Sequence, residues 1–193
     1  DPRVVLGPGV GRDAAVIDLC ERYLVAKTDP ITFATDEIGW YAVHVNANDV
    51  ACTGAAPRWF LATLLLPESE ATPAMVDAIF DQIANGCQGL DIALVGGHTE
   101  ITHGIDRPIV VGCMLGEVAP ERLVRPDGAR LGDTLLLTKG VAVEGTAIIA
   151  REGVSGLNGG NGGNGGDGGF LERCRGFLHD PGISVVRDAA VAT

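Results

Sequence analysis

The sequence has no apolar run approaching the roughly 18 residues that a membrane-spanning helix requires. It also lacks the order of basic, apolar and small residues that marks a secretory signal peptide. Basic residues are few: 14 lysines and arginines stand against 25 aspartates and glutamates, which gives a net charge of −11. Such a charge is repelled by the phosphate backbone of nucleic acids. We therefore expect a soluble, cytoplasmic protein with neither a nucleic-acid partner nor a membrane partner.

Several catalytic motifs are missing as well. The five cysteines are odd in number and contain no CxxC pair, so a zinc site or a disulfide framework has little support. No GxSxG motif marks a serine nucleophile, and no GxxxxGK[ST] loop marks a P-loop. Residues 153–169 are almost entirely glycine and asparagine. We predict a flexible loop there, because this stretch can bury too little surface to offset the entropy lost on ordering.

Apolar patterning predicts an α/β chain. We expect one helix from a cap at Thr35 or Asp36 to about Cys52, stopped by Gly54, and a second from Pro73 to about Gly86 or Gly89. The continuous apolar run at 58–66 is typical of a strand buried on both faces. We place an N-terminal domain at 1–120 and the beginning of a second domain at 121–193, with a strand at 134–138 and a helix at 143–151. The other predicted strands are 4–6, 14–19, 23–27, 92–95 and 109–115.

Four oxygen-bearing side chains stand beside turns or helix ends. Asp13 belongs to a glycine-rich turn, and Asp29 follows a strand and precedes Pro30. Asn46 and Asp49 are three residues apart on one face of the first helix, near its C-terminal end, where the helix dipole disfavours an anion. Carboxylates that a fold brings together repel one another and favour a hard cation. We therefore predict a Mg²⁺ site, with a nucleotide attached.

Each of the three aspartates has a simpler explanation. Asp49 could instead form hydrogen bonds with Thr53 or backbone amides. Asp29 could form an Asx turn, and Asp13 could belong to an ordinary hairpin. Two lysines, Lys27 and Lys139, stand near strand ends within reach of phosphates, although solvated lysines are the usual case.

The segment Gly96-Gly97-His98-Thr99-Glu100 is predicted to end a buried strand. Paired glycines at such a position let a ligand or another backbone approach closely.

Taken in order, the motifs GVGRDAAV, TDP, NANDVACTGAAPRW, GGHTE and LVRPDGARLGDTLLLTKG resemble the aminoimidazole ribonucleotide (AIR) synthetase superfamily. This superfamily includes HypE-type hydrogenase maturation proteins, thiamine-monophosphate kinases and selenophosphate synthetases. The resemblance covers about residues 4–152 and looks closest to HypE-like proteins and, in GAAPRWFLATLLLP, to thiamine-monophosphate kinases.

The resemblance implies an α/β (α+β) domain, a mixed sheet with helices on one face, whose sheet joins that of a second subunit in a barrel-like homodimer. It implies that Asp13, Asp29 and Asp49 hold Mg²⁺ and, through it, ATP. Asn46 is implied as a nearby polar contact. The residues implied to line the nucleotide cleft are Gly96, Gly97, His98, Thr99 and Glu100. Arg12 stands where many relatives carry a second acid, which leaves the number of metals open.

The function implied by the resemblance is that of an ATP- and Mg²⁺-dependent enzyme that activates a substrate oxygen by phosphoryl transfer. Only the beginning of the C-terminal domain is present, so we expect the chain to be a truncated piece of such an enzyme. Two alternatives stay open. One is a nucleotide-binding dimerisation module without turnover, and the other is a thiamine-monophosphate kinase.

Overall fold

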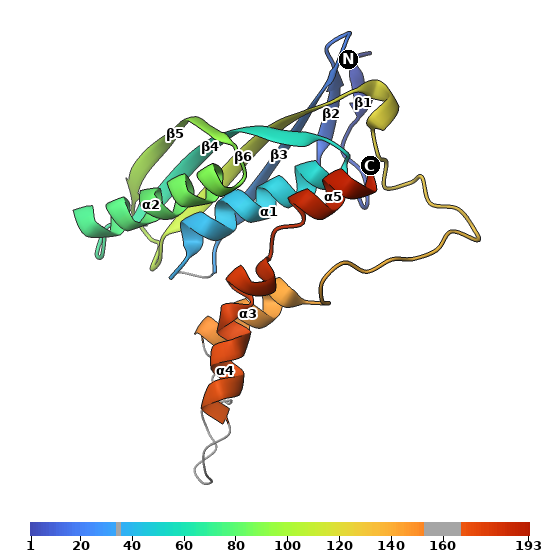
Figure 1. Cartoon of the computed structure of the whole chain (residues 1–193). Helices are drawn as coiled ribbons and strands as arrows, with labels where there is room; N and C mark the ends of the chain where they lie inside the picture. The colour runs from blue at the N-terminus through green and yellow to red at the C-terminus, as the bar shows by residue number, and fades with distance from the viewer. Residues whose placement is uncertain (34–35, 153–166) are drawn as a thin grey trace.

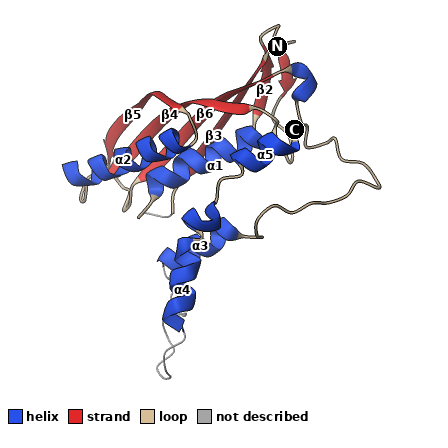
Figure 2. Ribbon diagram, in the orientation of Figure 1, coloured by secondary structure: helices blue, strands red, loops and turns tan. Residues whose placement is uncertain are grey.

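The computed structural model of the chain describes residues 1–33, 36–152 and 167–193. A six-stranded sheet forms one layer, and the helices α1 and α2 lie side by side on one of its faces (Figures 1 and 2). The strands are β1 (Val4–Leu6), β2 (Ala15–Asp18), β3 (Tyr23–Ile31), β4 (Ala56–Pro67), β5 (Ala93–Thr102) and β6 (Ile109–Val118). The helices are α1 (Ile38–Cys52), α2 (Pro73–Gly89), α3 (Val143–Glu152), α4 (Asp167–Gly176) and α5 (Val186–Ala192), with short turns η1 (Pro120–Arg122) and η2 (Leu178–Gly182).

The strand order is β1-β2-β3-β6-β4-β5. Strands β4 and β5 are parallel and are connected through α2, whereas every other pair in the sheet is antiparallel. A parallel pair requires such a crossover connection. The predicted fold class, a mixed sheet with helices on one face, is therefore confirmed for a single chain.

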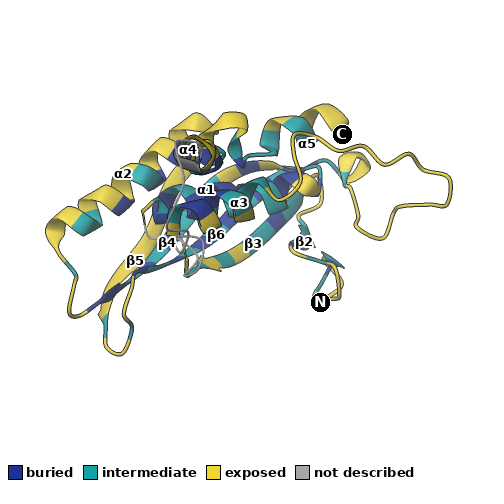
Figure 3. Ribbon diagram, turned by 90° about the horizontal axis from the view of Figure 1, so that it is seen from below, coloured by how far each residue is buried: buried dark blue, intermediate teal, exposed yellow. Residues whose placement is uncertain are grey.

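The core lies between the sheet and α1. Ten of the 15 residues of α1 are buried, and α1 is accordingly the darkest helix in Figure 3. Gly54 follows the end of α1 at a φ of +81°, and a Cβ there would collide with the carbonyl of Arg122. The predicted stop is thus correct, but the N-cap is not. Glu37 takes that position without a side-chain cap bond, and Thr35 lies outside the described residues.

The opposite face of the sheet is not covered by helices. Along β6 and from Phe60 to Leu66 of β4 every second residue is buried, and the residues between are only half-buried. The prediction that residues 58–66 are buried on both faces is therefore wrong, because the helices pack on one side only. The half-buried residues that form the uncovered face include Leu61, Thr63, Leu65, Val111, Cys113 and Leu115.

Two strands are longer than predicted. Strand β3 continues to Ile31, so Asp29 lies inside the strand and not after it. Its partner β2 reaches only the position opposite Ala26. The later residues of β3 thus have a neighbouring strand on one side only, and Pro30 is tolerated there because proline fits a free strand edge.

Strand β5 runs through Thr102 and is exposed along nearly its whole length, so the GGHTE segment lies within an edge strand and does not end a buried one. The pairing of β5 with β4 shifts between Phe60 and Leu61. Just beyond this shift, a Cβ on Gly97 would collide with the backbone of Ala62. The backbone that approaches this glycine is therefore that of the neighbouring strand.

The C-terminal part contains less regular structure than predicted. Residues 134–138 form no strand; Leu135, Leu136 and Leu137 are exposed. A strand needs hydrogen-bonding neighbours, and the described residues offer this segment none. Helix α3 confirms the predicted helix. The predicted loop at 153–169 lies outside the described residues up to 166, and α4 begins at Asp167.

A small second core joins α3 and η2 to α1. Its buried members are Tyr41, Ala147, Leu178 and Ile183. Through it, the polypeptide after residue 142 is packed against the N-terminal half of α1. No helix in the described ranges is both long and apolar enough to cross a membrane.

Gly112 tests the packing of α1 on the sheet. A Cβ at this position of β6 would overlap the Asn46 amide and come within 2.8 Å of the Phe60 ring. We expect Gly112→Ala to lower the free energy of unfolding by about 1–3 kcal/mol, the usual cost of overpacking. Gly145→Ala is the matched control: it meets nothing within 4 Å and should add about 0.5–1 kcal/mol as a helical alanine. Urea denaturation measures both, and equal stabilities would contradict the packing described.

Candidate functional site

A lysine stands at the centre of the predicted acidic site. Lys27 on β3 directs its Nζ to Oδ2 of Asp49 on α1 at 2.8 Å, and to Oδ2 of Asp29 at 3.6 Å. The Lys27 side chain is only 10% exposed and that of Asp49 27%. Helix α1 packs directly on β3, which brings these groups together. The sequence expectation of a solvated Lys27 was therefore wrong.

Asp13 completes this arrangement from the loop before β2. It lines a cavity of about 260 Å³ together with Asp49, Cys52 and Thr53. Although Asp13 is exposed, its charge acts on both Lys27 and Asp49. Asp29 and Asp49 thus face the Lys27 ammonium group directly, and Asp13 adds its negative charge from the neighbouring loop.

The pKa shifts show that one lysine does not fully compensate the acids. Burial opposes the charge on Lys27, but the hydrogen bond and charge of Asp49, with the charges of Asp29 and Asp13, outweigh it and raise the Lys27 pKa. The pKa of Asp49 is also raised, because burial outweighs the attraction of Lys27 and the neighbouring aspartates add repulsion. The site therefore remains short of positive charge.

A fourth carboxylate belongs to this site and was missed in the sequence. Glu144, half-buried in the first turn of α3, has its pKa raised by burial and then by the charges of Asp49 and Asp29. The available signal was an acidic residue in the first turn of the helix that follows Lys139-Gly140. We call Asp13, Asp29, Asp49 and Glu144, with Lys27, the acid cluster.

Asn46 lies beside the acid cluster and is completely buried. Its Nδ2 donates to the carbonyl of Ala42 at 2.8 Å and to that of Asp29 at 3.4 Å. Its Oδ1 has no hydrogen-bond partner within the described part of the chain. Asn46 thus ties α1 to the backbone that carries Asp29 and leaves one buried acceptor unused.

The chemistry of these donors matches Mg²⁺, which prefers carboxylate oxygens. Within the described ranges, however, no three His, Cys, Asp or Glu side chains are grouped as a preformed metal centre. The ammonium group of Lys27 supplies the positive charge that compensates these carboxylates. A divalent cation would therefore enter beside Lys27 or in exchange for it.

The predicted cleft residues of the GGHTE segment lie elsewhere. Asp29, Gly112, Ala62 and Gly97 form one row across the sheet, and three strand spacings separate Asp29 from Gly97 by about 14 Å. Gly96, Gly97, His98 and Thr99 line a separate groove of about 380 Å³ with Phe80 and Leu94. Oε2 of Glu100 lies 3.8 Å from Nε2 of His98, and both side chains are exposed. Their role in nucleotide binding stays a prediction.

Comparison with known proteins identifies the family. Residues 11–118 match the family described as AIR synthase related protein, N-terminal domain. This match covers more than half of the chain, so the protein belongs to the AIR synthase-related family.

Individual relatives have different activities. The chain is 30% identical over 137 residues to thiamine-monophosphate kinase of Aquifex aeolicus, covering 67% of this chain and 43% of the relative. It is 31% identical over 150 residues to carbamoyl dehydratase HypE of Azotobacter vinelandii, covering 74% and 44%. The solved structure of AaThiL complexed with AMPPCP and TMP superposes with a TM-score of 0.72 at 23% identity, covering 94% of this chain and 57% of that one. The chain thus spans less than half the length of these curated relatives.

Replacing Lys27 tests its role as the internal cation. Lys27→Met leaves partly buried carboxylates without their counter-charge, and we expect the free energy of unfolding in metal-free buffer to fall by about 1–3 kcal/mol. The double variant Lys27→Met/Asp49→Asn should lose less than the two single variants combined, because the pair interacts directly. Additive losses in this cycle would show that Lys27 and Asp49 are not coupled.

Proposed function

We propose that the protein is the N-terminal, nucleotide-binding part of a cytoplasmic, homodimeric enzyme that uses ATP and Mg²⁺ to activate a substrate oxygen by phosphoryl transfer. The observation that carries this proposal is the acid cluster, in which Asp29 and Asp49 share the Lys27 ammonium group and the charges of Asp13 and Glu144 add to theirs. An excess of oxygen donors suits a metal-bound polyphosphate better than a free anion.

In this proposal Asp13, Asp29 and Asp49 hold Mg²⁺, and Glu144 contributes to the negative field around it. The bound metal neutralises phosphate charge, which is most of what such chemistry asks of a protein. The chain's own contribution is positioning. Strand β3 carries Lys27 and Asp29, and α1 carries Asp49, so two of the three donors stand on rigid elements. With a metal bound, Lys27 would be available to interact with a phosphate oxygen.

The relatives support nucleotide use. A thiamine-monophosphate kinase shares 30% of its matched residues with this chain, and the similar AaThiL structure contains AMPPCP, an analogue of ATP. The second candidate, a thiamine-monophosphate kinase, is favoured by this same relative and by the TMP in that structure. Turnover of thiamine monophosphate, but of no other acceptor, by the full-length protein would select it.

Nucleotide binding tests the proposed site. We expect the chain to bind ATP in the presence of Mg²⁺, and Asp29→Asn and Asp49→Asn to weaken this binding more than tenfold. Loss of one hard anionic ligand should cost at least about 1.4 kcal/mol, one decade of affinity. Asp77→Asn, an exposed acid on α2, is the charge-matched control. Calorimetry that finds equal affinities for all four proteins would refute the site, and binding without turnover in the full-length protein would favour the non-catalytic module.

The uncovered face of the sheet is the proposed dimer interface. Its residues are apolar and only half-buried, and the adjacent edge strand β5 exposes Leu94, Val95 and Ile101. An open strand edge next to an apolar face favours association. The family resemblance implies the same arrangement, in which two sheets close into a barrel.

Light scattering tests the homodimer. The chain should have twice its monomer mass at micromolar concentration, and Val111→Asp on the uncovered face should shift it to the monomer, because two buried charges would then face each other. Val10→Asp, on a fully exposed side chain, should leave the mass unchanged. A monomeric parent chain would contradict the proposal.

A further inference from the structure

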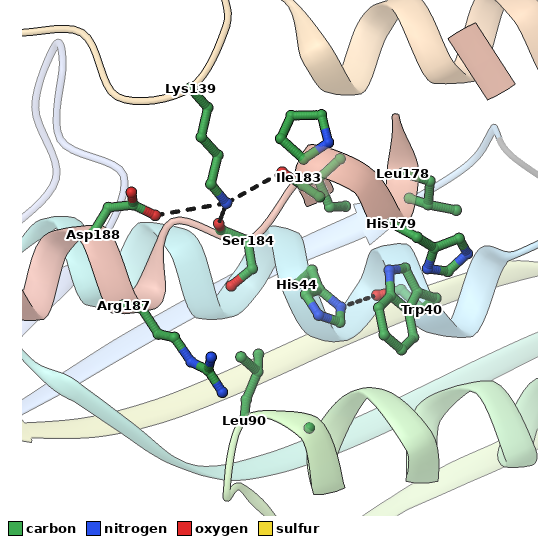
Figure 4. A pocket seen from close by; sticks show the side chains of 13 residues that line it. Trp40, His44, Leu90, Lys139, Leu178, His179, Ile183, Ser184, Arg187 and Asp188 are labelled. Atoms are coloured by element: carbon green, nitrogen blue, oxygen red, sulfur yellow. Dashed lines mark hydrogen bonds and ion pairs between the residues drawn. The ribbon is translucent and has the colours of Figure 1, made fainter. Parts of the chain in front are cut away.

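A second cavity lies on another side of α1. It has a volume of about 530 Å³ and is bounded by α1, the residues just after α2, and the segment that carries η2 and α5 (Figure 4). His44 lines it from α1, five residues before Asp49. Five residues turn a helix by about 140°, so His44 and Asp49 point in widely different directions. The cavity is therefore separate from the acid cluster.

The wall formed by the C-terminal segment is held in place by polar contacts. The Asn48 side chain donates to the carbonyl of Ile183 and accepts from the N–H of Val185, both at 2.8 Å. The Lys139 ammonium donates to the carbonyl of Gly182 at 3.3 Å. These bonds fasten the segment to α1 and to the residues before α3. The cavity is thus already shaped before any ligand enters, which lowers the entropy cost of binding.

One positive charge at the rim of the cavity, on an exposed side chain, lacks a counter-charge among the described residues. Lys139 and Asp188 form an ion pair at 3.6 Å and balance each other. Arg187 also lines the cavity, and Figure 4 shows its side chain extending toward Leu90. Among the described residues it has no hydrogen-bond or ion-pair partner. A guanidinium group with all its donors free is suited to bind a carboxylate or phosphate in two-point fashion.

The α1 side of the cavity is aromatic. The rings of Trp40 and His44 are stacked at 4.1 Å, and the His179 ring meets Trp40 at 4.9 Å. Nδ1 of His44 lies 3.0 Å from the carbonyl of Trp40 and donates to it. Burial lowers the pKa of His44, so the ring is neutral and its Nε2 remains an acceptor. Leu90 and Leu178 add apolar surface.

We propose that this cavity binds a small organic anion that combines a flat ring with a phosphate or carboxylate group. Arg187 binds the oxyanion, the ring lies against Leu90 and Trp40, and Nε2 of His44 accepts from an N–H or O–H of the ligand. The volume is that of pockets for ligands of this size, and a largely apolar lining with a few polar groups is usual for them. A phosphate ester and a carboxylate share this chemistry.

The test uses phenyl phosphate and benzoate as probes in separate calorimetric titrations of the chain. We expect at least one of them to bind with a Kd on the order of 1 mM or tighter, as befits ligands of this size, and which of the two binds better identifies the oxyanion. Inorganic phosphate has the oxyanion without a ring, and benzyl alcohol has the ring without an oxyanion. Each should bind at least about tenfold more weakly than the better probe. Failure of both probes to bind overturns the proposal.

Arg187→Gln should lower the affinity for the tighter-binding probe at least about tenfold, because the two-point contact with the oxyanion is lost. Arg22→Gln removes the same charge from the turn between β2 and β3, outside the cavity lining, and should leave the affinity within about twofold because solvent and salt screen distant charges. If the two substitutions weakened probe binding equally, the probe would be held by general charge attraction, and the proposal of a specific site at Arg187 would be wrong.

Two further measurements place the ligand. Binding should change the fluorescence of the parent chain, and Trp40→Phe should abolish that change while calorimetric binding persists, since the flat ring is kept. A fluorescence change that survives in Trp40→Phe would place the probe elsewhere. Asp49→Asn and chelation of metal should leave probe binding unaltered, so this proposal and the proposed function fail independently.

Discussion

The ion pair between Lys27 and Asp49 connects the central helix to the sheet, and the candidate site depends on it. Helix α1 is held against β3 and β6 by apolar packing, which places a carboxylate in a partly buried position where desolvation raises its pKa. Without a counter-charge, that position would repel Asp13, Asp29 and Glu144 as well. A single ammonium group, nearly buried, makes the arrangement possible, and it leaves the carboxylates with too little positive charge.

The sequence predicted the helices well because their signals are local. Gly54 after α1 and Pro73 at the start of α2 are such signals. It also predicted that Asp13, Asp29 and Asp49 belong together. The role of Lys27 was not predictable, since the register of β3 against β6 decides which face a side chain occupies. Likewise Pro30 suggested a strand end, whereas the early end of β2 lets the strand continue.

Contacts between distant residues account for the other differences. Gly97 indicated the close approach of a ligand or of another backbone, and the neighbour proves to be the backbone of Ala62 on the adjacent strand. Residues 134–138 have a composition typical of a strand, with three leucines between two threonines. They form none, because no described strand pairs with them. Glu144 joins the acid cluster, and the second cavity forms, only because the chain after residue 142 packs back on α1 through contacts such as that between Asn48 and Ile183. Such contacts leave no periodic pattern in the sequence.

Helix α1 therefore contributes to two candidate sites with two of its faces. The face that carries Asp49 meets β3, and the face that carries Trp40 and His44 meets the C-terminal segment. Coupling between the sites would require α1 to adopt two positions, but its contact with α2 is too close for sliding: Gly39 lies against the backbone of Ile79, and Gly86 against Val43. We therefore expect α1 to hold each set of side chains in place without transmitting the occupancy of one proposed site to the other. The close packing of α1, which disfavours the charged form of Asp49 by burying it, is thus also the reason to expect the two candidate sites to act independently.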